Sequence, residues 1–144
     1  MKISTKGRYG LRAILYLAIH AEGSHVPLHQ IAENQQLSVG YTEQIFSTLR
    51  RAGIVKSVKG AQGGYVLADL PEQITVGAVF RALEGDLALT QEESQEENPF
   101  ERCINRAVWQ PLDERISELL DTVTLATLMA DYQKHDTGGY VFMI

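Results

Sequence analysis

Residues 38–68 read SVGYTEQIFSTLRRAGIVKSVKGAQGGYVLA, and this stretch decides the fold. Its first part predicts a helix that begins after Ser38, whose hydroxyl can cap the free amides of the first turn, and that ends near Gly53. Three- and four-residue spacing gathers an apolar stripe on one side of this helix and leaves polar and basic side chains on the other. The stripe consists of Tyr41, Ile45, Phe46 and Leu49.

The sequence after Gly53 predicts a β-hairpin. Residues 54–58 and 65–67 are rich in β-branched and aromatic side chains, and the turn between them is rich in glycine. Glycines let such a turn adopt positive φ and bring backbone amides close to a phosphate, while Lys56 and Lys59 add positive charge. A basic helix followed by a basic hairpin is typical of a winged helix-turn-helix that binds DNA. We therefore expect a mainly α fold with a small β-hairpin wing.

The candidate DNA-binding residues come from the N-terminus, the exposed side of the predicted reading helix and the hairpin. They are Lys2, Lys6, Arg8, Ser38, Gly40, Tyr41, Glu43, Gln44, Ser47, Arg50, Arg51, Lys59, Gly60, Gly63, Gly64 and Tyr65. Cationic side chains neutralise phosphates, whereas Gln44 suits adenine and Glu43 can accept a hydrogen bond from cytosine.

The distribution of charge supports this interpretation better than its total. The chain carries a net charge of −5, from 13 basic and 18 acidic residues. Residues 1–68, however, hold eight basic and three acidic side chains, a net charge of +5, and residues 69–144 hold five and 15, a net charge of −10. One half can attract a polyanion while the other repels it.

Two other classes of protein compete with a DNA-binding protein. An enzyme finds no support, because the chain has no GxxxxGK, GxGxxG or nucleophile-elbow motif. A winged-helix module that binds another protein remains open, since fold alone does not determine function, but such a module has no need for a basic face.

Two helices should precede the reading helix. The first is expected over residues 5–21, with Leu11, Ile14, Leu15, Ala18 and Ile19 on its buried side, and a short second helix should follow Pro27. The winged helix-turn-helix domain would then occupy residues 1–68. Residues 69–144 would form a dimerisation and regulatory region.

That second region contains three recognisable parts. A helix capped by Thr75 should end at Gly85, and the acidic segment 86–98 is too like-charged to pack, so we expect a mobile loop. Asn98 and Pro99 begin a helix of about 24 residues, which Pro111 should bend. The apolar tail 138–144 is expected to dock on a sheet edge or across a dimer.

The long helix has more apolar surface than a small domain can cover. We therefore assign its stripe to self-association, the alternative being a helix buried wholly within one subunit. The expected interface residues are Ile104, Val108, Leu112, Ile116, Leu119, Leu120 and Val123.

Cys103 is the only cysteine, which fits a reducing cytosol. It is a candidate redox sensor because Arg102 and Arg106 flank it, the alternative being a small buried apolar residue. We expect no metal site, since Pro27 separates His25 from His29. The apolar N-terminal stretch is too short to span a bilayer, so a cytoplasmic protein without membrane contact is expected.

Four segments together resemble the Rrf-type bacterial winged-helix regulators. They are KISTKGRYGLRAI, LSVGYTEQIFSTLRRAGIVKSVKGAQGGYVL, ITVGAVFRALEG, and ERCINRAVWQPLDERI followed by TLATL, and they cover nearly the whole chain in order. The resemblance implies a homodimeric transcription factor, usually a repressor, that binds a pseudo-palindromic double-stranded operator. Its DNA affinity would depend on redox, iron–sulfur, nitric oxide or sulfur-metabolite status.

The cysteine content separates the branches of this family. Members that carry a cluster have three cysteines, of which Cys103 resembles the third, while residues 86–102 contain none and Arg106 stands where a histidine ligand would help. We therefore expect no iron–sulfur cofactor held by the three-cysteine set. The resemblance favours the cysteine-metabolism repressor branch, whose partner is a cysteine-synthesis enzyme, O-acetylserine thiol-lyase. An iron–sulfur or nitric-oxide-responsive regulator with non-standard ligands remains the alternative.

Overall fold

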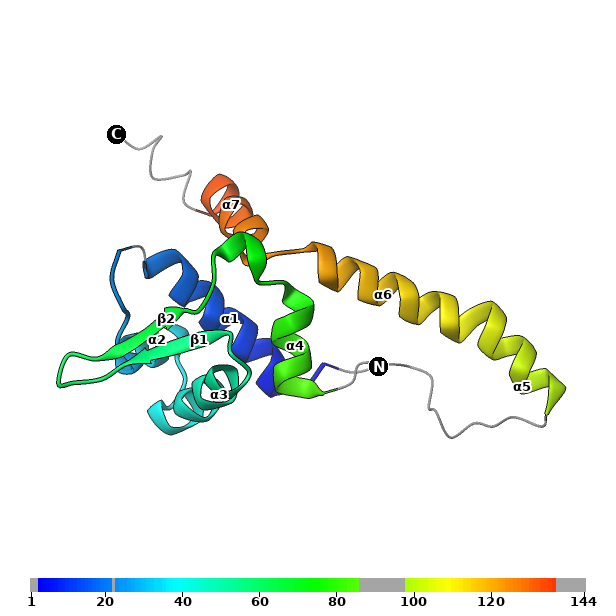
Figure 1. Cartoon of the computed structure of the whole chain (residues 1–144), viewed down its shortest axis with the longest axis horizontal. Helices are drawn as coiled ribbons and strands as arrows, with labels where there is room; N and C mark the ends of the chain where they lie inside the picture. The colour runs from blue at the N-terminus through cyan, green and yellow to red at the C-terminus, as the bar shows by residue number, and fades with distance from the viewer. Residues whose placement is uncertain (1–2, 22, 86–97, 137–144) are drawn as a thin grey trace.

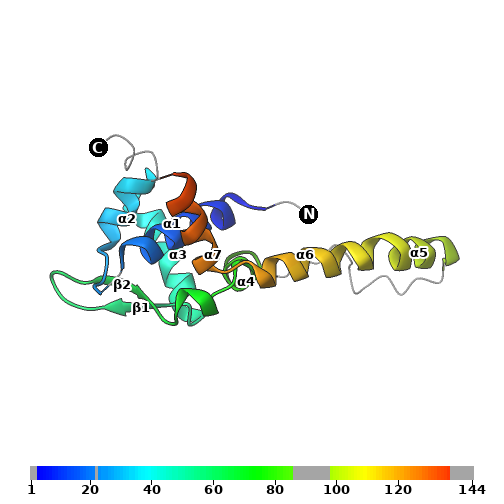
Figure 2. The same cartoon turned by 90° about the horizontal axis from the view of Figure 1, so that it is seen from above.

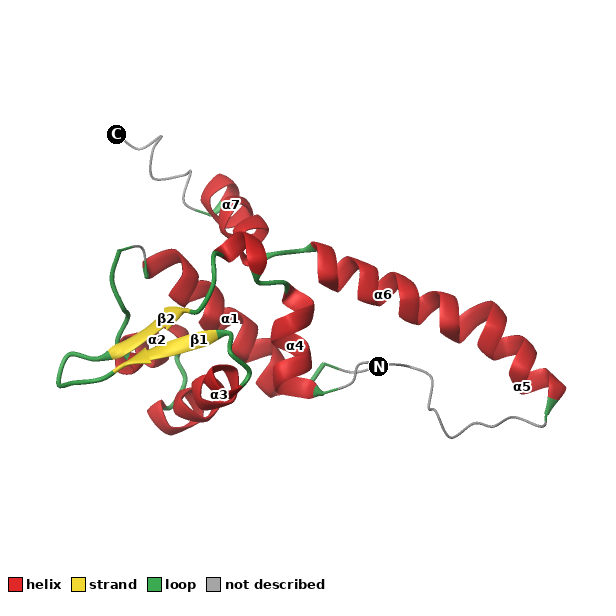
Figure 3. Cartoon of the chain, in the orientation of Figure 1, coloured by secondary structure: helices red, strands yellow, loops and turns green. Residues whose placement is uncertain are grey.

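The structure is a computed structural model that describes residues 3–21, 23–85 and 98–136. Its described elements confirm a mainly helical fold with one two-stranded hairpin (Figures 1 and 3). In chain order they are α1 (Thr5–His20), α2 (Leu28–Gln35), α3 (Val39–Arg51), β1 (Val55–Val58), β2 (Gly64–Leu67), η1 (Pro71–Gln73), α4 (Val76–Glu84), α5 (Pro99–Ile104), η2 (Asn105–Trp109), α6 (Gln110–Thr122) and α7 (Leu125–His135).

Side-chain caps determine where the helices begin. The Ser38 hydroxyl accepts a hydrogen bond from the Tyr41 amide at 3.1 Å, and the Thr75 hydroxyl accepts one from the Ala78 amide at 3.0 Å. At the other end, Gly53 follows α3 with φ of 79° and Gly85 follows α4 with φ of 84°. These are conformations that glycine adopts without steric cost. The predicted limits of α3 and α4 are thus confirmed.

α1 lies at the centre of the compact body, where it contacts α2, α3, α4, α7 and β2 (Figure 1). Ile14 and Ala18 are buried as predicted, and Leu11 packs against the core, but the centre of the buried side differs from the prediction. Leu11, Leu15 and Ile19 are only partly buried, whereas Ala13, Tyr16 and Leu17 belong to the core. A helix covered on several sides has no single buried stripe, so periodicity alone cannot orient it.

The wing is an antiparallel pair in which Val55 lies opposite Leu67 and Val58 lies opposite Gly64. Val26, in the loop before α2, forms an isolated antiparallel β-bridge with Tyr65, with two backbone hydrogen bonds of 3.0 and 2.9 Å. The hairpin is therefore attached to the helical body along β2.

α5, η2 and α6 form one helical rod that projects from the body (Figures 1 and 2). η2 is a π-helical segment in which the Gln110 amide donates to the Asn105 carbonyl, five residues back. The segment ends two residues before Pro111, which has no amide hydrogen to donate. The predicted long helix is confirmed, and next to the proline it contains a π turn.

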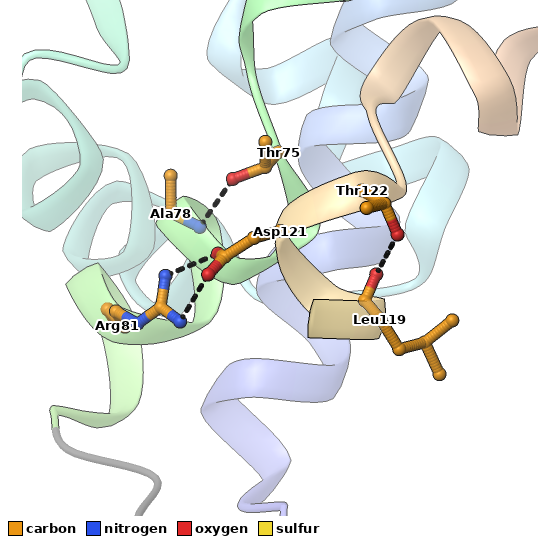
Figure 4. Close-up of polar contacts among 6 residues, drawn as sticks. All are labelled: Thr75, Ala78, Arg81, Leu119, Asp121 and Thr122. Carbon is orange, nitrogen blue, oxygen red and sulfur yellow. Dashed lines mark hydrogen bonds and ion pairs between the residues drawn. The ribbon is translucent and has the colours of Figure 1, made fainter. Parts of the chain in front are cut away.

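The base of the rod is fastened to α4 (Figure 4). Arg81 donates two hydrogen bonds to the Asp121 carboxylate, of 2.6 and 3.0 Å. Hydrogen bonding to Arg81 lowers the pKa of Asp121, partial desolvation opposes this, and the Arg81 charge adds to the lowering. The pair therefore acts at neutral pH and is lost only as the pH falls through the lowered pKa of Asp121.

A side chain at Gly77 would overlap Asp121 and lie 3.2 Å from the Leu120 carbonyl, so the close approach of α4 and α6 needs glycine there.

α7 was not predicted from the sequence, yet it completes the core. Its N-cap Thr124 accepts from the Thr127 amide at 3.1 Å, and the Leu125 amide donates to the Ile74 carbonyl at 2.9 Å. Leu125 has no exposed surface and packs in the same cluster as residues of α1 and α3. The core thus includes residues on both sides of the predicted boundary at residue 68.

Two predicted features lie outside the described residues: the acidic loop, apart from Asn98, and the C-terminal tail. Within the described ranges, no helix combines the length and apolar character needed to cross a membrane.

The packing of α7 gives a test of this core. Leu125→Ala should lower the free energy of unfolding by about 2–5 kcal/mol, because it leaves a cavity among fully buried side chains. Urea unfolding measures this. Leu70→Ala is the matched control, since Leu70 is 63% exposed and its truncation should change the free energy by less than about 0.5 kcal/mol. Equal values for the two variants would contradict the packing of α7 in the core.

Candidate nucleic-acid interface

α3 presents one face to the core and the opposite face outward. Ile45, Phe46 and Leu49 have no exposed surface. Thr42 is also fully buried, and its hydroxyl donates to the Ser38 carbonyl at 2.8 Å, so no polar group is left unsatisfied. The predicted outward residues Gly40, Glu43, Gln44, Arg50 and Arg51 are exposed, and Ser47 is partly exposed. The predicted orientation of α3 is confirmed.

The outward face of α3 meets the start of α1 in a shallow groove. Lys6 of α1 lines this groove together with Gly40, Glu43, Gln44, Ser47, Thr48 and Arg51 of α3. The Lys6 ammonium lies 3.3 Å from the Thr48 hydroxyl oxygen, and Arg51 approaches the same oxygen to 3.4 Å. Two cations therefore converge on one neutral hydroxyl, beside side chains that can bond base edges.

Thr48 was missed by the sequence analysis. Its hydroxyl donates to the Gln44 carbonyl at 3.0 Å, which leaves its oxygen free to accept from both cations. Nothing in the spacing of the sequence distinguishes this threonine. Its role depends on Lys6, which lies 42 residues earlier in the chain.

The wing places a second basic group at the surface, since Lys59 is exposed beside Gly60. Of the wing glycines, Gly60 has the positive φ expected in this turn, at 121°, and Gly63 and Gly64 do not. These two need glycine for another reason: a side chain would collide with the carbonyl of Val58 or of Val26. His25 contacts the Gln62 carbonyl through Nε2 and so ties the tip of the wing to the loop before α2.

A second groove separates the wing from the starts of α2 and α3. Its lining includes Leu28, His29, Val39 and Gly60. Val39 is 52% exposed at the first position of α3 and was not predicted as a functional residue. An exposed aliphatic side chain at this end of a reading helix can contact a thymine methyl group.

The remaining predicted residues have different surroundings. Both predicted tyrosines are partly buried against the core: the Tyr65 ring lies 5.0 Å from that of Phe46, and the Tyr41 ring packs edge-on against Tyr9. Arg8 is exposed and donates to the Ile3 carbonyl at 3.3 Å. Lys2 lies outside the described residues.

The structure separates this surface from the candidate sensor. Cys103 is an exposed free thiol on α5, at the end of the rod distant from the wing (Figure 1). In the described part of the chain, no three His, Cys, Asp or Glu side chains cluster as metal ligands would.

Comparison with known proteins identifies the class of this fold and surface. Residues 3–131 match the Rrf2 family model, described as an iron-dependent transcriptional regulator. The chain is 42% identical to the HTH-type transcriptional regulator IscR of Aliivibrio salmonicida over 132 residues, 91% of this chain and 79% of the relative. It is 40% identical to IscR of Yersinia enterocolitica over 146 residues, 95% and 89% of the two chains.

Solved structures lead to the same class. CymR, the global cysteine regulator of B. subtilis, superimposes with a TM-score of 0.79 at 41% identity, covering 90% of this chain and 97% of CymR. IscR of T. potens gives a TM-score of 0.75 at 42% identity, covering 94% and 91%. The chain belongs to the Rrf2 family of winged-helix transcription regulators. Its relatives are named as regulators and not as enzymes, and both the IscR and the CymR branches are represented.

Proposed function

We propose that this regulator is a cytoplasmic repressor that binds a pseudo-palindromic DNA operator as a homodimer and responds to sulfur, cysteine or redox status. The observation that carries the DNA-binding surface is the groove in which Lys6 and Arg51 converge beside Gln44 and Glu43. Cations at its edge suit phosphates, and the amide and carboxylate suit base edges. The exposed Lys59 of the wing would hold a further phosphate.

The exposed apolar side of the rod supports a homodimer. Phe100 is 77% exposed and Leu119 is 62% exposed, and Ile104, Val108 and Leu112 between them are also exposed. Of the predicted interface residues, Ile116, Leu120 and Val123 are partly buried. Solvent-exposed apolar surface of this extent on one rod is typical of a protein interface. A second copy would cover it and place two reading helices on two half-sites.

The ligands expected for a cluster do not fit this chain. A [2Fe–2S] cluster needs four good ligands, mostly thiolates, and the sequence contains one cysteine. Cys103 itself is exposed on a helix between Arg102 and Ile104, neither of which binds iron. We infer that no cluster is held by the three-cysteine set. The alternative, an iron–sulfur or nitric-oxide-responsive regulator with non-standard ligands, is favoured only by the names of the IscR relatives and of the family model.

Two routes then remain for the signal. The first is oxidation or persulfidation of the exposed Cys103 thiol. The second is a partner protein such as a cysteine-synthesis enzyme, which would bind the acidic half of the chain. The likeness to CymR supports a signal from sulfur supply, because CymR is a cysteine regulator.

DNA binding by a dimer is tested by salt and by a substitution on the rod. Affinity for the protein's own upstream region should fall with salt by about 0.9 log units per log unit for each phosphate neutralised. Leu112→Glu should give a monomer and weaken binding, because it puts a charge into the apolar stripe. Gln110→Glu adds the same charge to an exposed position on the opposite side of α6 and should leave the dimer intact. Gel filtration and a shift assay measure both. Salt-independent binding, or a monomeric unsubstituted protein at micromolar concentration, would refute the proposal.

The different roles proposed for Lys59 and Gln44 in the DNA-binding surface give a second prediction. Lys59→Ala should weaken binding to all sequences alike and reduce the salt slope by about one, because a phosphate contact carries no sequence information. Gln44→Ala should instead lose about 1–3 kcal/mol of discrimination at one base pair. Titration of single-base operator variants distinguishes them. The same uniform loss for both substitutions would show that the two roles are wrongly assigned.

The signal route is tested with Cys103→Ser, which removes the only thiol. If the thiol is the sensor, peroxide or polysulfide should inhibit DNA binding by the unsubstituted protein and leave Cys103→Ser unaffected. Equal sensitivity in both proteins would exclude the thiol and leave the partner route. A brown anaerobic preparation with iron and an absorption band in the visible range would instead overturn the proposal that no cluster binds.

A further inference from the structure

The N-terminal turn of α1 holds a charge of the wrong sign for a helix. The start of a helix carries a partial positive charge, which favours acidic side chains and disfavours basic ones. The first turn of α1 has no acidic residue, and Lys6 lies within it. The same lysine lines the groove of α3, so its place near the helix start serves the surface and opposes the stability of the helix.

A carboxylate from a distant part of the chain offsets the unfavourable positive charge in this turn. Glu84, the last residue of α4, accepts a hydrogen bond from the Ser4 amide at 2.8 Å and a second from the Ser4 hydroxyl. Ser4 is the N-cap of α1, and its hydroxyl oxygen also accepts from the Gly7 amide at 3.2 Å. Glu84 therefore satisfies one free backbone amide and places a negative charge at the positive end of the helix.

The start of α1 and the end of α4 approach closely at this point. A side chain at Gly7 would collide with the carboxylate oxygen of Glu84 and lie 2.9 Å from its carboxylate carbon. Three residues after the Ser4 cap, only glycine leaves room for the carboxylate where it lies. The contact thus holds the start of α1 against the end of α4 and sets the position from which Lys6 of α1 reaches Thr48 of α3.

We propose that Glu84 is a positioning residue for DNA binding: by clamping the Ser4 cap it fixes the first turn of α1, so that Lys6 points across the groove toward Thr48 and a phosphate. Lys6 keeps one contact with the Thr48 hydroxyl, at 3.3 Å, and an ammonium has three donors, so two remain for phosphate oxygens. The inference rests on the DNA-binding surface proposed above. It adds that an acidic residue outside that surface strengthens binding to a polyanion.

Charge and position predict opposite effects when Glu84 is removed. If Glu84 acts only through its charge, Glu84→Ala should bind DNA more tightly, because a repulsive carboxylate has gone. If it acts through Lys6, Glu84→Ala should bind more weakly, and the salt slope should fall by about one, as it should for Lys6→Ala. The ratio of Kd at 200 mM to Kd at 50 mM salt would then fall by about fourfold.

Three further variants make the test specific. Gly7→Ala keeps every charge but displaces the Glu84 carboxylate, so it should match Glu84→Ala, and alanine favours the helix, so circular dichroism should show undiminished helix content. Glu84→Gln keeps an acceptor oxygen for Ser4 and should retain the slope of the unsubstituted protein. Glu72→Ala is the matched control, because Glu72 is an exposed carboxylate on η1 whose removal should not lower the slope.

The decisive measurement is the salt slope of binding to the promoter duplex for a protein that carries two substitutions. In a Lys6→Ala background, Glu84→Ala should reduce the slope no further, because the two residues act as one unit. Additive losses, or tighter binding by Glu84→Ala and Gly7→Ala, would overturn the clamp. If Lys6→Ala lowers the slope and Gly7→Ala does not, the clamp alone fails. If Lys6→Ala leaves the slope unchanged, the proposed DNA-binding surface is itself wrong at Lys6.

Discussion

The burial of α1 on several sides is the constraint on which the rest of the structure depends. Ala13, Ile14 and Leu17 have no exposed surface, and four helices and a strand contact this one helix. Removing so much apolar surface from water is the main favourable term in folding. Because α4 and α7 supply part of the cover, residues beyond the wing are needed to complete the body that carries it.

Local signals in the sequence predicted the element boundaries well. A cap is decided by one side chain and an amide two or three residues on, so Ser38, Thr75 and Asn98 could be recognised without tertiary information. Glycines at positive φ marked the ends of α3 and α4 in the same way. The buried side of α1 and the existence of α7 could not be predicted, because both depend on which other elements lie against them.

In the candidate site, too, the features set by local sequence were predicted and those set by distant contacts were not. The outward face of α3 follows from helical periodicity, and its exposed polar and basic residues were predicted, although Val39 was missed. Tyr41, which the periodicity places in the buried stripe, and Tyr65 were also candidates for DNA contact. The rings of both pack on the core, because an aromatic ring buries apolar area wherever a neighbour allows. Thr48 and Glu84 were missed, since each acquires its role from a residue more than 40 positions away.

α4 contacts both the base of the rod and the start of α1. Its first residues are bonded to the linker between α6 and α7, Arg81 holds Asp121 at the base of the rod, and Glu84 holds the cap of α1. A glycine lies at each of these two contacts: Gly77 of α4 lies against α6, and Gly7 of α1 lies against Glu84 of α4. Helices packed this closely cannot shift easily relative to one another. In the proposed dimer, the rods would set the distance between the two copies of α3. A change in the angle between a rod and the body that carries α3 would act on α4 and, through the linker at Val123, on α7, and both of these helices pack against α1.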